Sequence, residues 1–125
     1  MDLKEKSVSL LSTTNVAFNG NGATTLYTVP AGKRCVLAYA TVIAGADAGA
    51  TTAVTIGQVG ALTDFLASNI LSNLDAQYDV VNLEPIPNTT PLKGKSYAAG
   101  TVIQMNVATQ SGGATNSVLL FGTLY

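Results

Sequence analysis

Four carboxylates between positions 64 and 84 are the side chains most suited to chemistry: Asp64, Asp75, Asp79 and Glu84. Paired carboxylates can flank a glycosidic bond as acid and nucleophile, and carboxylate oxygens are ligands that calcium prefers. Their spacing does not match a calcium-binding loop, in which acidic residues alternate ahead of a glycine. We therefore expect solvated surface charges and no metal site, with a carboxylate-based hydrolase as the remaining enzymatic alternative.

Other catalytic arrangements lack an essential residue. The sequence contains no histidine, which removes Ser-His-Asp and Cys-His catalysis and the commonest zinc ligand. The segment Gly94-Lys95-Ser96 would fit a phosphate-binding loop only with glycine at the position of Thr89. Lys93 and Lys95 lie in a predicted polar turn, whereas Ser-Lys chemistry needs a buried lysine. We predict a protein that is not an enzyme and uses no cofactor.

The charge of the chain argues against two classes of partner. Only 10% of its 125 residues are charged, against about 25% in an average domain, and the net charge is -1. The six cations are scattered, so no basic patch is available to attract nucleic-acid phosphates. No apolar run reaches the roughly 20 residues that a membrane helix needs. We predict neither a nucleic-acid partner nor a membrane partner.

The amino-terminal residues and the cysteine content bear on where the protein is made. The segment "MDLKEKSVSLL" mixes both signs of charge ahead of a short apolar run, so it does not fit a secretory signal. A lone cysteine, Cys35, lies among apolar residues and is expected to pack as a small hydrophobe. Both features fit synthesis in a reducing cytosol.

A hydrophobic period of two residues dominates the chain. Between Thr101 and Thr109, Ile103, Met105 and Val107 fall on one face, as a half-buried strand requires. The residues of Leu62–Leu74 fit either one short helix or two small strands. The other predicted strands are Val8–Leu11, Thr24–Val29, Arg34–Ile43, Ala53–Ile56, Gln77–Leu83 and Ser117–Tyr125.

Turn-forming segments separate these strands and indicate how they are connected. A parallel sheet would need crossover helices, for which the sequence offers at most one short pattern. The connections are also too long for a simple series of two-residue hairpins. We therefore predict an all-β fold: a single antiparallel β-sandwich of about eight strands, jelly-roll-like in its connections, spanning residues 15–125 behind an N-terminal arm of residues 1–14.

The segment "TTLYTVPAGKRCVL", residues 24 to 37, predicts a strand, a tight turn and a second strand. Pro30 suits the first central position of a turn and Gly32 a positive φ, and Ala99-Gly100 repeats this pattern. In the second strand, alternation places Cys35, Leu37 and Tyr39 opposite Val36, Ala38 and Ala40. Because both faces are apolar, we expect this strand in mid-sheet, with one face covered by the other sheet and one by a loop or a partner chain.

Three segments resemble small structural proteins of tailed-bacteriophage virions: "TTLYTVPAGKRCVLAYATV", "LKGKSYAAGTVIQMNV" and "SVLLFGTLY". The resemblance covers about half of the chain, and it lies in turns and strands of jelly-roll domains. Such domains occur in capsid decoration (cement) proteins and in some head- or tail-fibre modules. The resemblance implies no catalytic site, a place on the outer capsid surface, the major capsid protein as partner, and dimers or trimers.

From this resemblance we expect a virion protein that is made in the bacterial cytoplasm and stabilises the capsid by binding the assembled shell. The leading arm is the expected capsid contact, through Met1, Asp2, Leu3, Lys4, Val8, Leu10 and Leu11. The expected core or subunit interface consists of Val36, Ala38, Ala40 and Val42. The alternatives are a head–tail connector component, or a tail or fibre module that recognises a host carbohydrate through the loops Ala44–Thr52 and Gln110–Asn116.

Overall fold

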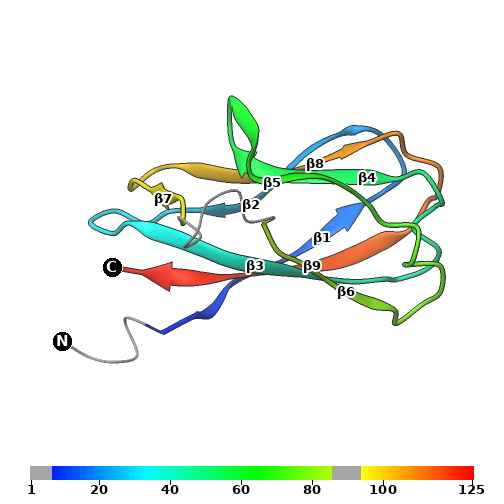
Figure 1. Ribbon diagram of the computed structural model, residues 1–125, viewed down its shortest axis with the longest axis horizontal. Coiled ribbons are helices and arrows are strands. Elements are labelled where there is room, and N and C mark those ends of the chain that lie inside the picture. The colour runs from blue at the N-terminus through cyan, green and yellow to red at the C-terminus, as the bar shows by residue number, and fades with distance from the viewer. Residues whose placement is uncertain (1–6, 86–93) are drawn as a thin grey trace.

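Two antiparallel sheets make up the computed structural model, which describes residues 7–85 and 94–125 (Figure 1). In the described residues the strands are β1 (Ser9–Ala17), β2 (Gly22–Thr28), β3 (Cys35–Ile43), β4 (Ala53–Gln58), β5 (Ala61–Ile70), β6 (Val80–Leu83), β7 (Ser96–Tyr97), β8 (Val102–Ala108) and β9 (Thr115–Leu124). One sheet has the order β1-β9-β3-β6, with β7 also paired to β3. The other has the order β2-β8-β4-β5.

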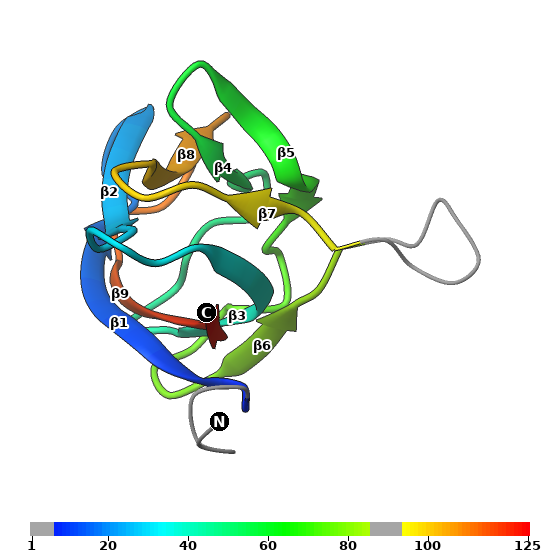
Figure 2. The same ribbon diagram turned by 90° about the vertical axis from the view of Figure 1, so that its left-hand side faces the viewer.

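The predicted all-β sandwich with jelly-roll-like connections is confirmed. The chain passes from one sheet to the other at every connection except β4–β5 and β6–β7. This places β9 between β1 and β3, and β8 between β2 and β4, as the two Greek keys of a jelly roll do. Figure 2 shows the two sheets as upper and lower layers. Strand β3 lies inside its sheet, as its two apolar faces predicted.

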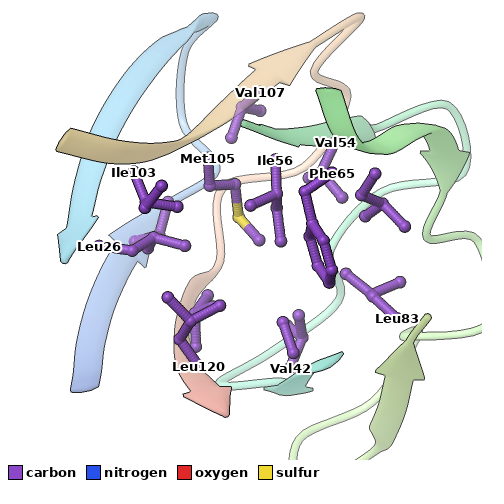
Figure 3. Close-up of a cluster of buried hydrophobic side chains, with 14 of the residues drawn as sticks. Leu26, Val42, Val54, Ile56, Phe65, Leu83, Ile103, Met105, Val107 and Leu120 are labelled. Atoms are coloured by element: carbon purple, nitrogen blue, oxygen red, sulfur yellow. The ribbon is translucent and has the colours of Figure 1, made fainter. Parts of the chain in front are cut away.

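The hydrophobic core fills the space between the two sheets. Ile103, Met105 and Val107, the predicted inward face of β8, are all buried. Their side chains point toward Val42 and Leu120 of the opposite sheet (Figure 3). Burying such side chains contributes roughly 1.5–3 kcal/mol each to folding, before the entropy cost is subtracted. The hydrophobic period of two residues in the sequence therefore corresponds to alternate side chains that face this core.

The helix considered for Leu62–Leu74 is wrong, because residues 61–70 form the single strand β5. Its register against β4 shifts twice, and the consecutive side chains of Phe65 and Leu66 are both buried as a result. The register shifts therefore give the apolar residues of β5 a spacing in the sequence that resembles one face of a helix. The chain of β5 passes so close to Gly57 that a Cβ there would overlap Ala61 O, so glycine is required at this position.

Two β-bulges flank the same point of β9. In β1, Leu10 pairs with Phe121 and Ser12 with Leu120, which leaves Leu11 as an extra residue. In β3, Leu37 pairs with Gly122 and Tyr39 with Phe121, which leaves an extra residue there as well. An extra residue reverses which side chains face the core beyond it.

The bulge in β3 corrects the alternation expected for that strand. The extra residue is Ala38, and beyond it Ala40 and Val42 are fully buried whereas Tyr39 is not. Val36 and Ala38 are half-buried. The four residues expected on one face are therefore divided between the core and the partly exposed side of the sheet, because a strict period of two cannot anticipate an inserted residue.

The leading arm expected for residues 1–14 is part of the sheet from Ser9 onward. Strand β1 runs to Ala17 and pairs with β9 along its length. Four of the expected capsid contacts, Met1, Asp2, Leu3 and Lys4, lie outside the described residues.

The turn between β2 and β3 has the predicted positive φ at Gly32, 75°. Lys33 N donates to Pro30 O at 3.3 Å, so Pro30 precedes the two central residues instead of being the first of them. The turn at Gly100, with φ 83°, has the same form, since Thr101 N donates to Ala98 O at 3.1 Å. Gly100 N also donates to Val29 O at 2.8 Å, so the two similar turns support each other.

The bulges lead to a stability prediction at Gly122. A Cβ there would lie 2.5 Å from Val36 O and 2.9 Å from Leu11 Cδ1, so Gly122→Ala forces the bulged strands apart. We expect this substitution to lower the free energy of unfolding by about 2 kcal/mol or more in urea denaturation. Gly20 has open space around its Cα, and Gly20→Ala is the control that should change stability by less than about 0.5 kcal/mol. Equal effects of the two substitutions would contradict this account.

Candidate functional site

The four carboxylates between positions 64 and 84 are spread over separate segments. Asp64 lies on β5, Asp75 and Asp79 lie in the connection to β6, and Glu84 follows β6. Across residues 7–85 and 94–125, no three acidic or cysteine side chains are grouped as a metal site requires. Asp79 closes a turn instead, because its Oδ2 accepts from Ala76 N at 3.0 Å. Asp64 and Asp79 thus take part in bonds that hold the fold.

Asp64 joins several segments at the hairpin end of the molecule. Its Oδ1 accepts from the Tyr97 hydroxyl at 2.8 Å, and its Oδ2 accepts from Gln58 Nε2 at 2.8 Å. Lys95 Nζ lies 3.8 Å from Oδ2. Burial, together with the bond to Asp64, raises the pKa of the Tyr97 phenol well above its usual value, so the phenol remains a proton donor. This group links β5 of one sheet to β7 of the other and serves the fold.

Cys35 is fully buried in the core, as expected for a small hydrophobe. Burial raises the pKa of its thiol to about 11. The thiolate is the nucleophilic form of cysteine, so at neutral pH this side chain is inert.

The loops considered for carbohydrate recognition are bonded to each other. Thr51 Oγ1 donates to Thr109 O at 2.8 Å, and Thr109 Oγ1 donates to Thr51 O at 2.6 Å. Gly45 N donates to Asn116 Oδ1 at 3.0 Å. Several polar groups of Ala44–Thr52 and Gln110–Asn116 therefore hold the end of the sandwich together, where a sugar would require groups directed outward.

One tyrosine beside these loops is presented to solvent. Tyr78 is 77% exposed and has a φ of 74°, which is unfavourable for a side chain with a Cβ. Two backbone bonds hold this conformation: Tyr78 N donates to Ala44 O at 2.8 Å, and Ala44 N donates to Asp79 O at 2.8 Å.

The outward side of the β1-β9-β3-β6 sheet carries an apolar surface without charge. None of its four strands contains a charged residue. We call its central part the β9 face, and cross-strand pairing places nine residues on it in three rows: Leu10–Phe121–Tyr39, Thr13–Leu119–Thr41 and Asn15–Ser117–Ile43. The rings of Tyr39 and Phe121 stack with centroids 4.7 Å apart. Val80, paired with Ile43, extends the surface onto β6.

The outward side of the opposite sheet is polar by comparison. Thr25 pairs with Gln104, whose Nε2 donates to Thr25 Oγ1 at 3.2 Å. In the next row Asn106 lies between Ala23 and Thr55. Both sheets belong to the same weakly charged chain, yet only the β9 face carries aromatic and large aliphatic side chains in its central rows. The low charge of the chain therefore does not by itself explain this difference.

The residues predicted for binding are distributed over this surface and the core. Val8 and Leu10 are 53% and 51% exposed at the beginning of the edge strand β1. Leu11 instead packs against the core, and Ala40 and Val42 belong to it. Val36 and Ala38 are half-buried, as stated above.

The sequence analysis missed Tyr39, Leu119 and Phe121 as surface residues. The alternation within "SVLLFGTLY" contained the signal for the two residues of β9, since Leu119 and Phe121 alternate with the buried Val118 and Leu120. Tyr39 had no such signal, because the bulge at Ala38 reverses its direction.

Comparison of the chain with protein-family models, curated proteins and solved structures found no match in any of the three. The described part of the chain contains no helix long and apolar enough to cross a membrane.

The buried thiol predicts a pH dependence of stability. Its pKa rises from 9.0 to about 11 on folding, so its contribution is present below pH 9 and is lost as the pH rises from 9 to 11. We expect Cys35→Ala to make the fall in unfolding free energy across this interval shallower. Leu37→Ala shortens another buried side chain of β3 without removing a titratable group, and it should leave the slope unchanged. An unaltered slope in Cys35→Ala would contradict the assignment.

Proposed function

We propose that this chain is a bacteriophage virion structural protein that decorates and stabilises the capsid by binding the assembled shell, without enzymatic activity. The resemblance of its turns and strands to cement proteins supports the proposal. So does the jelly-roll sandwich, in which the chemically capable side chains described above are engaged in holding the fold. Its place is the outer capsid surface, and its partner is the major capsid protein.

The observation that carries the proposal is the beginning of β1. In the described part of the chain this strand lies at the edge of its sheet with β9 as its neighbour, and Val8, just before it, and Leu10 expose apolar side chains there. An edge strand can accept a strand from another protein, and exposed apolar side chains give such pairing its specificity. Because β1 contains no charged residue, covering it removes no charge from water.

Stabilisation of the shell follows from mass action. A protein that binds the assembled lattice and not the separate subunits lowers the free energy of the assembled state. An oligomer that contacts several capsomers at once gains further from multivalency.

A second candidate function is a tail- or fibre-associated module that binds a host carbohydrate. The exposed Tyr78 favours it, because a solvent-facing aromatic ring can stack on a sugar and its unfavourable φ suggests a selected conformation. The neighbouring loops weigh against it through the bonds that they make to each other. A head–tail connector component would use the same apolar edge as a capsid protein.

The test is co-sedimentation of the purified protein with phage capsids. The capsids are first stripped of this protein, and both expanded and unexpanded shells are used. We expect saturable binding to expanded shells and a raised shell melting temperature. Val8→Asp should weaken binding at least about tenfold, because the edge contact would then bury a carboxylate. Ala23→Asp places the same charge on the exposed edge strand of the other sheet and should bind like the wild type.

The absence of wild-type binding to either shell would overturn the capsid proposal, and a glycan array with Tyr78→Ala as its control would then test the second candidate. Equal loss of binding in Val8→Asp and Ala23→Asp would overturn the role of β1.

A further inference from the structure

We propose that the β9 face is the surface through which two copies of this chain associate, sheet against sheet, around a two-fold axis parallel to β9. This inference concerns a second copy of the chain, and it holds or fails independently of binding to a capsid. It rests on the arrangement of side chains across the three rows, on their lack of charge and on the size of the surface.

Two of the three rows are nearly symmetric about β9, whereas the row of Ser117 has Asn15 on one side and Ile43 on the other. Leu119 lies between two threonines, Thr13 of β1 and Thr41 of β3. Phe121, two residues along, lies between Leu10 and the stacked ring of Tyr39. A two-fold axis along β9 places β1 of one copy over β3 of the other and keeps each row opposite itself. An isologous interface requires this self-complementarity.

In the resulting pair, side chains of one kind meet in two of the three rows, and in the third Asn15 of one copy lies opposite Ile43 of the other. The aromatic row containing Phe121 packs on its own copy, and aromatic contacts contribute beyond the area they bury. At the next level Leu119 faces Leu119 across the axis, with hydroxyl groups of Thr13 and Thr41 beside it. Sheets pack face to face about 10 Å apart, so the pair would have the layer spacing found within a β-sandwich, with the two β9 strands parallel to each other.

Charge distinguishes a second copy from a charged partner. The four strands of this sheet contain no charged residue, so two such faces meet without like-charge repulsion and without burying an ion. A face for an acidic or basic partner would carry opposite charges to select it. The β9 face has none, and its symmetry provides the complementarity that charge provides elsewhere.

The surface is large enough for a stable pair. Strands β1, β9 and β3 each have nine or ten residues. At about 3.3 Å per residue and about 4.8 Å between strands, they and β6 cover about 500 Å² of sheet. Two copies would bury about 1,000 Å² in total, which reaches the lower bound expected of a specific interface.

The central residue of the face is the place to disrupt it. Leu119→Lys puts two ammonium groups next to each other on the axis, and sedimentation equilibrium between about 1 and about 100 µM measures the effect. We expect a wild-type dimer and a dissociation constant raised at least about 100-fold in the variant. Asn106→Lys is the matched control, since Asn106 lies on the outward side of β8, the strand that occupies the corresponding place in the other sheet. It should leave the dimer intact.

A second variant and a cross-link keep the test decisive if Leu119→Lys does not fold. Thr13→Lys introduces the charge at an exposed position of the same row and should also dissociate the dimer. Leu119→Cys should be joined to its copy by a bis-maleimide cross-linker, because the axis brings the two positions to about 10 Å apart, which is too far for a direct disulfide. Asn106→Cys should not be joined. A monomeric or trimeric wild type, a dimer that survives both lysine variants, or dissociation by Asn106→Lys would each overturn the proposal.

Discussion

The pairing of β9 with a bulged strand on each side is the constraint that organises this protein. Phe121 is the residue of β9 that borders both bulges, and at the next residue, Gly122, the lack of a Cβ leaves room for the side chain of Leu11 and for the backbone at Val36. The two extra residues decide which side chains of β1 and β3 enter the core. The same geometry that buries Ala40 and Val42 therefore turns Tyr39 outward against Phe121.

The side chains capable of chemistry serve the fold. Asp64 accepts bonds from Tyr97 and Gln58 and so connects the β4–β5 hairpin with β7. The thiol of Cys35 is buried, and burial holds its pKa near 11. At the other end of the sandwich, Thr51 and Thr109 bond each other's backbone. These bonds between distant segments favour a fixed shape, and a fixed shape lowers the entropy cost of association.

The contrast between the two outward faces supports the proposed function by association. Gln104 and Asn106 make one of them a surface that water solvates well, whereas Leu119 and Phe121 lie in the middle of the other. The apolar face and the free edge of β1 adjoin at Leu10, so one sheet offers both a broad surface and an edge. Under these proposals, a second copy would cover the β9 face and a shell protein would contact the edge at β1. The two surfaces share Leu10 but otherwise consist of different residues.

The class of fold and the position of β3 inside its sheet were predictable from the sequence, because alternation of apolar residues and the placement of turns are local properties. The positive φ at Gly32 and its repetition at Gly100 were predictable for the same reason. The direction of Tyr39 and the strand at residues 61–70 were not predictable, since both depend on bulges that arise only when a neighbouring strand has a different number of residues. The β9 face was likewise beyond local patterns: its residues come from three strands that are distant in the sequence, and only pairing of β9 with β1 and β3 places them side by side.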